Sequence, residues 1–250
     1  MKAGTNNMKK PYLFFDAGGT VVFLSFDVFR REAAKHDIRL DEAAFSSALA
    51  RLGFRHDQQR LQGLSQQESF AGRHYFRLIL EELGVDPKMA EAIKDGIVAI
   101  NARRNIWSAS HAWVGSSLRE LMSMGYDMSI ISNTDGRVRE QLQDAGIVQY
   151  FARIFDSKLI GRAKPDPAFF IHCCTDLGLR PEECLYIGDS LAIDVLGANN
   201  AGMPAVLVDE GDLYGAWGGL RIGTVRELPA LLQRHADIYH EPGAFILPRS

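Results

Sequence analysis

Apolar and polar residues alternate along most of the chain in a way that predicts strands and helices in turn. Short apolar runs, typical of buried strands, are followed by longer stretches in which apolar residues recur every three or four positions. This alternation predicts an α/β fold with a doubly wound, mostly parallel sheet. The expected strands cover 11–16, 128–131, 154–155, 184–187 and 205–208, and the expected helices cover 114–124, 136–145, 167–177, 191–201 and 225–234.

A long stretch near the N-terminus has a different character. From about residue 25 to residue 104 the apolar residues, including those around Phe26 and Phe45, follow helical spacing, and no convincing strand interrupts them. Helices are expected over 65–83 and over 87–102, the second with a proline in its first turn. We therefore predict an all-helical domain over 23–105, inserted into an α/β core domain made of 1–22 and 106–250.

Composition narrows the class of protein. Of the 250 residues, 46% are hydrophobic and 24% are charged, as in an ordinary globular protein. The net charge of −3 argues against a nucleic-acid partner but is compatible with a small anionic substrate. Three cysteines do not make a disulfide framework, and no apolar stretch is long enough for a signal peptide or a membrane span. We expect a cytoplasmic protein without a membrane partner, either a monomer or a homodimer.

The most informative stretch is the loop after the first predicted strand. The apolar run 12–15 stops at Asp16, which is followed at once by a turn containing Gly18 and Gly19. In open α/β folds, ligands bind at the carboxyl edge of the sheet, where this acid would lie. A turn whose aspartate only accepts backbone hydrogen bonds gives the same short pattern, so other positions must decide between the two interpretations.

Three later segments carry polar side chains, two of them directly after a predicted strand and one just before a proline-led helix start. Parallel strands with helical crossovers would bring such ends to one edge of the sheet. A carboxylate that attacks phosphorus, a lysine and a hydroxyl that neutralise its oxygens, and further acids that hold a cation suit phosphate chemistry. The positions are Ser132 and Asn133, then Lys164, and last the acids Asp189 and Asp194.

With these four segments in this order, the chain resembles the haloacid dehalogenase (HAD) superfamily, mostly phosphatases that form a phosphoaspartyl intermediate. The resemblance covers all four motifs and the core, roughly two-thirds of the chain. Each motif is short and weakly specific by itself. The set is specific because the motifs occur in the correct order and follow apolar runs typical of strands. The resemblance implies a Rossmann-like core, a helical cap that closes over the active site, a small phosphorylated substrate and Mg²⁺ as cofactor.

The resemblance also implies a role for each residue. Asp16 would be the nucleophile and a metal ligand, Asp189 the second metal carboxylate, and the carbonyl of Gly18 a third ligand. Asp194 would either bind the metal or orient Lys164, and both roles stay open. The phosphoryl group would be bound by Ser132, Asn133, Lys164 and the backbone of Gly18, Gly19 and Thr20.

Gly18 departs from the family pattern. Typical phosphatases of the superfamily carry a second aspartate there, which protonates the leaving oxygen and then activates water. Its absence implies slow hydrolysis of ordinary phosphate monoesters, a preference for leaving groups that need no proton, or a proton supplied by the cap or the substrate.

Three other interpretations were weighed against the phosphatase. 2-Haloacid dehalogenases also lack the second aspartate, but they have no use for the metal acids Asp189 and Asp194. Phosphonoacetaldehyde hydrolases use a cap lysine, and the predicted cap has none between Lys35 and Lys88. A catalytically weakened core that serves as a binding or regulatory module is the third interpretation, and the intact nucleophile, lysine and metal acids argue against it.

Overall fold

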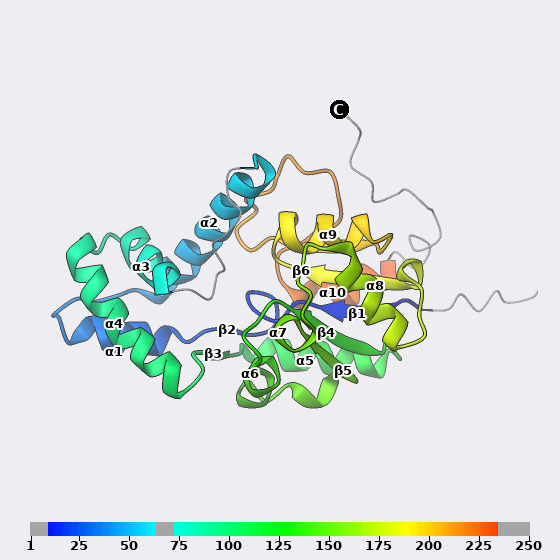
Figure 1. Cartoon of the computed structure of the whole chain (residues 1–250), viewed down its shortest axis with the longest axis horizontal. Coiled ribbons are helices and arrows are strands. Elements are labelled where there is room, and N and C mark those ends of the chain that lie inside the picture. The colour runs from blue at the N-terminus through cyan, green and yellow to red at the C-terminus, as the bar shows by residue number, and fades with distance from the viewer. Residues whose placement is uncertain (1–9, 64–72, 235–250) are drawn as a thin grey trace, which may run out of the picture.

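The computed structural model describes residues 10–63 and 73–234, which form an α/β core and a helical lobe beside it (Figure 1). The core contains a six-stranded sheet in the order β5-β4-β1-β6-β7-β8, and every neighbouring pair of strands is parallel. The predicted α/β fold class is therefore confirmed. The strands are β1 (Tyr12–Phe15), β4 (Met128–Ser132), β5 (Arg153–Asp156), β6 (Cys184–Gly188), β7 (Ala205–Val208) and β8 (Arg221–Ile222).

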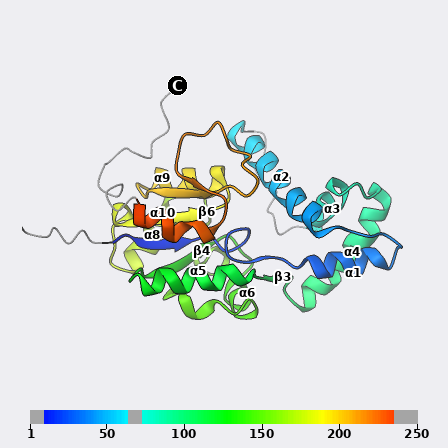
Figure 2. The same ribbon diagram turned by 180° about the vertical axis from the view of Figure 1, so that it is seen from behind.

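The central strand β1 is apolar along its length because both faces of the sheet are covered. Leu13 and Phe15 pack into one hydrophobic cluster and Phe14 into another, as expected for a strand inside a parallel sheet. Three helices contribute residues to the first cluster: α5 (Ala112–Ser123), α6 (Val138–Asp144) and α10 (Leu228–Arg234). Figure 2 shows α5 and α10 on the same side of the sheet. Helices α8 (Pro167–Asp176) and α9 (Leu196–Asn200) cover the other face.

The helical lobe, defined here as helices α1–α4, lies between β2 and β3 in the sequence. It has a hydrophobic core of its own, in which the ring of Phe29 lies 4.9 Å from that of Phe45 and 5.9 Å from that of Phe76. Asp86 caps the last helix of the lobe, which has proline in its first turn as predicted. The helices are α1 (Phe26–Ala34), α2 (Glu42–Leu61), α3 (Arg73–Glu82) and α4 (Pro87–Arg103).

A two-stranded antiparallel ribbon joins the lobe to the core. It pairs β2 (Phe23–Leu24) with β3 (Trp107–Ala109), and the sequence pattern did not predict it, because two or three residues are too few to show a period. The domain boundaries at 22/23 and 105/106 stay a proposal. Part of the helix expected over 65–83 lies outside the described residues, and α3 begins at Arg73.

Two further differences concern the C-terminal part of the core. The helix expected over 191–201 begins with a π-helical turn, Leu191–Val195, and continues as α9. The short edge strand β8 was not predicted, for the same reason as the ribbon. No helix in the described ranges combines the length and the apolar character needed to cross a membrane.

Candidate active site

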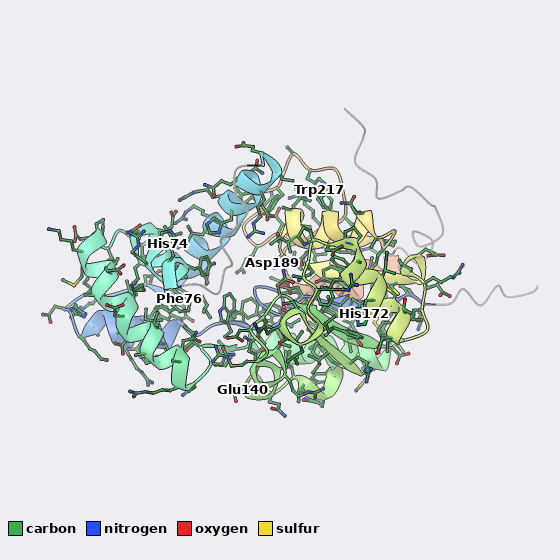
Figure 3. All side chains as sticks on the ribbon, viewed as in Figure 1. His74, Phe76, Glu140, His172, Asp189 and Trp217 are labelled. Carbon is green, nitrogen blue, oxygen red and sulfur yellow. The ribbon has the colours of Figure 1, made fainter. Side chains whose placement is uncertain are left out.

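The parallel sheet brings three of the predicted site residues to one edge. Asp16 directly follows β1, Ser132 ends β4 and Asp189 directly follows β6, and these are three neighbouring strands. The backbone N–H of Asp16 donates to the carbonyl of Ile187 at 2.8 Å, so the β1–β6 ladder continues as far as Asp16. Figure 3 places Asp189 on the side of the core that faces the helical lobe.

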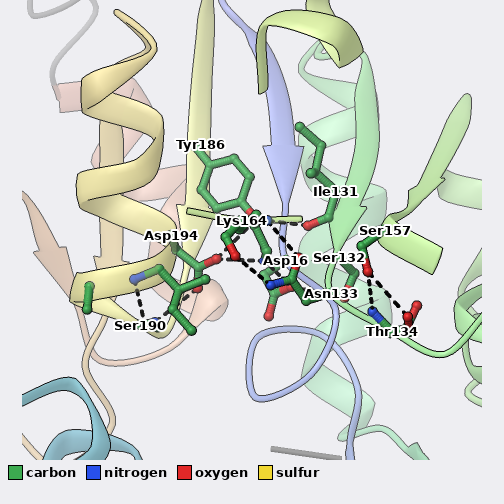
Figure 4. A network of polar contacts seen from close by, with 12 residues as sticks. Asp16, Ile131, Ser132, Asn133, Thr134, Ser157, Lys164, Tyr186, Ser190 and Asp194 are labelled. Carbon is green, nitrogen blue, oxygen red and sulfur yellow. Dashed lines mark hydrogen bonds and ion pairs between the residues drawn. The ribbon is translucent and has the colours of Figure 1, made fainter. Parts of the chain in front are cut away.

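Lys164 joins this edge from the loop before α8. Its buried Nζ donates to Asp16 Oδ1 and to Asp194 Oδ1, both at 2.6 Å, and to the hydroxyl of Tyr186 at 2.9 Å (Figure 4). Burial by itself lowers the pKa of Lys164, but Asp16 and Asp194 outweigh it and raise the pKa to about 12. The ammonium group is therefore fixed in its charged form between two carboxylates.

Asn133 holds the backbone of this lysine. The side-chain carbonyl of Asn133 accepts from the N–H of Lys164, and its amide donates to the carbonyl of Lys164, both at 2.8 Å. This pair of bonds explains how a loop residue becomes a fixed part of the site. The direct contact of Asn133 with a phosphoryl group stays a prediction.

The carboxylate of Asp16 is oriented by two donors. Ser132 Oγ donates to Asp16 Oδ1 at 3.1 Å, beside the bond from Lys164. Burial raises the pKa of Asp16, Lys164 opposes this, and Asp194 adds to the rise. Ser132 and Lys164 thus both contact the carboxylate of Asp16, and their predicted contacts with substrate oxygens would be made from the same positions.

Asp194 uses both of its oxygens within the protein. Oδ1 accepts from Lys164 Nζ, and Oδ2 accepts from the backbone N–H of Ser190 at 3.0 Å. Of the two roles left open for Asp194, the structure shows the orientation of Lys164 directly. Metal binding by Asp194 stays a prediction.

The carboxylate of Asp189 differs from those of Asp16 and Asp194 in its hydrogen bonding. Among the residues that the structure describes, none donates a hydrogen bond to it, and burial, followed by the charges of Asp16 and Asp194, raises its pKa well above the ordinary value. Gly19, with φ of +80°, lies so close that a Cβ there would come within 2.2 Å of Asp189 Oδ2. Only glycine permits this approach of the two loops.

These acids fit a hard divalent cation. Asp16, Asp189 and Asp194 each offer a carboxylate oxygen, and the three oxygens lie within 4.8 Å of one another. Carboxylate oxygens are the ligands that Mg²⁺ prefers, and of these three carboxylates Lys164 forms ion pairs with Asp16 and Asp194. A cation at this point would offset the burial and the repulsion by Asp16 and Asp194 that together raise the pKa of Asp189.

An aromatic ring lies beside Gly18, in the loop that follows β1. A Cβ added to Gly18 would lie 3.2 Å from Cζ3 of Trp107, which belongs to β3. Trp107 was not among the predicted site residues, and neither was Tyr186, whose hydroxyl accepts from Lys164. No local pattern marks either residue, because each resembles an ordinary apolar position in a strand.

A cavity of about 690 Å³ lies over the site, between the core and the lobe. Eight of the nine predicted site residues line it, so the structure brings them to one place, whereas the buried Thr20 is not part of the lining. The helical lobe contributes mostly apolar and aromatic groups to the other wall. The predicted site residues on the core side of the cavity are Asp16, Gly18, Gly19, Ser132, Asn133, Lys164, Asp189 and Asp194. The apolar and aromatic residues on the lobe side include Phe26, Phe45, Leu49, Phe54 and Tyr75.

Comparison with characterised proteins gives several similar phosphatases. The phosphoserine phosphatase of Thermus thermophilus is 30% identical over 191 residues, which are 75% of this chain and 75% of the relative. The glyceraldehyde 3-phosphate phosphatase of Methanopyrus kandleri is 33% identical over 138 residues, which are 55% of this chain and 59% of the relative. The chain therefore spans less than two-thirds of the length of the Methanopyrus relative.

Solved structures share the fold at low sequence identity. The HAD hydrolase YfnB of Bacillus subtilis, crystallised with magnesium, superimposes with a TM-score of 0.63 at 19% identity and covers 90% of this chain and 99% of its own. The 2-haloacid dehalogenase of Pseudomonas syringae pv. tomato gives a TM-score of 0.52 at 20% identity, with the same coverage. A family model of haloacid dehalogenase-like hydrolases matches residues 12–202. With its parallel sheet and this match over most of its length, the chain belongs to the haloacid dehalogenase-like hydrolases.

Proposed function

We propose that the protein is a Mg²⁺-dependent phosphatase of a small phosphorylated metabolite and acts through a phosphoaspartyl intermediate on Asp16. The observation that carries the proposal is the meeting of Asp16, Lys164 and Asp189 at one edge of the sheet, with an acid cluster that fits a divalent cation. The phosphatase names of the similar curated proteins support it. We further propose that the helical lobe is the cap and that the protein is cytoplasmic, without nucleic-acid or membrane partners, as a monomer or a homodimer.

The proposed reaction has two displacements at phosphorus. A carboxylate oxygen of Asp16 attacks the phosphorus in line, the bond to the leaving oxygen breaks, and a phosphoryl group stays on Asp16. Water then attacks the same phosphorus, the acyl phosphate bond breaks, and inorganic phosphate and the Asp16 carboxylate are formed. Lys164 and Ser132 neutralise the phosphoryl oxygens during both displacements. When bound, Mg²⁺ supplies the positive charge that lets an anionic nucleophile approach a phosphate dianion.

The same acid cluster argues against a dehalogenase. A haloacid carries a carboxylate and needs no divalent cation, so three acids around one lysine would repel it. Asp189, with a pKa raised by burial and by two neighbouring acids, has a purpose when a cation is bound. We therefore favour phosphate esters as substrates.

Metal dependence is the first test of the proposal. Phosphate release should stop in EDTA and return on addition of excess Mg²⁺, because Asp16 and the substrate repel each other without the cation. Mg²⁺ at a hundred times its dissociation constant should also stabilise the fold by about 2.7 kcal/mol, measured by thermal unfolding. Asp189→Asn should lose most of this stabilisation. Equal activity in EDTA and in Mg²⁺ would show that no metal takes part.

The leaving group should matter strongly for this enzyme. Gly18 has no acidic side chain to protonate the leaving oxygen, and the indole ring of Trp107 lies where such a side chain would begin. General acid catalysis contributes about 10²–10⁴-fold, so p-nitrophenyl phosphate, whose leaving group needs no proton, should be hydrolysed at least about 10²-fold faster than an alkyl phosphate. Steady-state kcat on the two substrates checks this.

A matched set of variants separates acid catalysis from binding. Gly18→Asp alone should gain little, because the new side chain meets the indole ring, whereas Gly18→Asp combined with Trp107→Ala should raise kcat on the alkyl phosphate by about 10²-fold. Trp107→Ala alone is the control for the added space. An identical response of both substrates to the double variant would mean that the missing acid is not the reason for the preference.

A further inference from the structure

A buried carboxylate of the lobe reaches into the core beside the candidate metal site. Asp57 lies near the end of α2, its side chain is fully buried, and α2 extends from the lobe to the core in Figure 1. Asp57 Oδ1 accepts from Ser190 Oγ at 2.6 Å. Its Oδ2 accepts from the hydroxyl of Tyr214 at 2.7 Å and from the N–H of Ala192 at 3.3 Å. All three donors belong to the core, and two of them lie in the segment 189–194 that carries both later acids.

The contact with Ser190 continues to the nucleophile. The N–H of Ser190 donates to Asp194 Oδ2 at 3.0 Å, and Asp194 Oδ1 accepts from Lys164, which donates to Asp16. Figure 4 shows the part of this series from Ser190 to Asp16. A continuous series of hydrogen bonds therefore connects a residue of the lobe with the carboxylate of Asp16.

Simple adhesion between lobe and core does not account for this arrangement. Taking a carboxylate out of water is costly, and the three partners of Asp57 are neutral donors that offset only part of the cost. Burial raises the pKa of Asp57, with Ser190, Tyr214 and Ala192 opposing the rise. An apolar contact is already present one turn earlier, where the ring of Phe54 lies 4.9 Å from that of Tyr214. A carboxylate, with its two oxygens, can accept hydrogen bonds from several donors of one loop at the same time.

We propose that Asp57 is a positioning residue: from the docked lobe it holds the segment 189–194, and so sets the arrangement of Asp189 and Asp194 in the metal site. The catalytic groups would then be fully aligned when the lobe is docked, which couples closure of the substrate cavity to metal binding. By thermodynamic linkage, Mg²⁺ would also favour the docked lobe. The part of this inference that concerns Mg²⁺ rests on the proposed function, whereas the ordering of segment 189–194 does not.

Three single variants test the inference. Asp57→Asn keeps the size of the side chain but replaces one acceptor oxygen by an NH2 group and removes the charge, so the bonds from Ser190, Tyr214 and the N–H of Ala192 are weakened or partly lost. Ser190→Ala removes the bond between Asp57 and segment 189–194 without changing any charge. It also removes the cap that Ser190 Oγ provides to the N–H of Ile193 at 3.0 Å, so faster exchange in this variant supports the inference only together with Asp57→Asn. Tyr214→Phe is the matched control, because it removes a bond of 2.7 Å from Asp57, close to the 2.6 Å of the bond from Ser190, and leaves the latter intact. Thermal unfolding checks each fold, and Asp57→Ala, which leaves the cap of Ser190 on Ile193 in place, carries the test if Asp57→Asn does not fold.

Two measurements are made on each variant. Hydrogen exchange of peptides covering 188–196, in EDTA, should be about tenfold faster in Asp57→Asn and in Ser190→Ala than in the unchanged protein. The Mg²⁺ dissociation constant from calorimetry should rise about tenfold in the same two variants and less than about twofold in Tyr214→Phe.

The outcomes separate this inference from the proposed function. Unchanged exchange in Ser190→Ala, or equal effects in all three variants, would overturn the positioning role. Weaker Mg²⁺ binding in Asp57→Asn alone would also overturn it, because only the lost charge would then matter. Faster exchange in the two variants, in a protein that neither binds Mg²⁺ nor hydrolyses phosphates, would support the ordering role and refute the proposed function.

Discussion

Asp16→Asn is expected to lower kcat for phosphate release by at least about 10⁴-fold, the size of effect seen when an enzyme loses its nucleophile. The amide of asparagine is a poor nucleophile and cannot form the acyl phosphate. Asparagine is close in size to aspartate, and its carbonyl can still accept from Lys164 and Ser132, so the fold should survive. Initial rates on p-nitrophenyl phosphate with Mg²⁺, together with thermal unfolding, measure the two effects separately.

Asp166→Asn is a suitable control for this variant. Asp166 caps α8 two residues after Lys164 and accepts from the N–H of Ala168 at 2.9 Å, but its side chain is exposed. Asparagine is an equally good cap, so this variant should keep activity and stability. Activity that persists in Asp16→Asn would transfer the nucleophilic role to another group.

Lys164→Met should have the second largest effect, on both activity and stability. The ammonium group is bonded to Asp16 and to Asp194, and removing one partner of a buried ion pair typically costs about 3–5 kcal/mol, because the remaining charges stay buried and unpaired. In EDTA we expect a loss of this size in the free energy of unfolding from urea titration. Loss of the group that neutralises phosphoryl oxygens should lower kcat by at least about 10²-fold.

Lys88→Met is the control for the loss of a lysine. Lys88 is exposed at the start of α4, so its replacement should change neither kcat nor the free energy of unfolding measurably. If Lys164→Met were as stable as Lys88→Met in EDTA, the bonds from Lys164 to the two acids would not be the strong buried pairs described above.

The fold of the core follows from patterns that are local in the sequence. Each buried strand is an apolar run, and Asp16, Ser132 and Asp189 were placed correctly at one edge because parallel strands leave their carboxyl ends on the same side. Lys164 was predicted from the neighbouring prolines, although the clamp by Asn133 that fixes it was not.

The residues that sequence reasoning missed depend on contacts between distant parts of the chain. Asp57 lies in helix α2, where a carboxylate usually faces solvent, and its burial arises from the contacts of α2 with the core. Trp107 belongs to a three-residue strand, and its position over Gly18 depends on the ribbon that joins lobe and core. Such features have no period and no motif, so a single sequence does not reveal them.

The most direct test of the central claim is to look for the phosphoryl group on Asp16. The enzyme is mixed with p-nitrophenyl phosphate and Mg²⁺, quenched in acid during turnover, and its peptides are analysed by mass spectrometry. We predict a phosphorylated peptide whose modification maps to Asp16 and which is absent from Asp16→Asn. Rapid phosphate release with no acyl phosphate on Asp16, under conditions that preserve such a bond, would contradict the proposed mechanism.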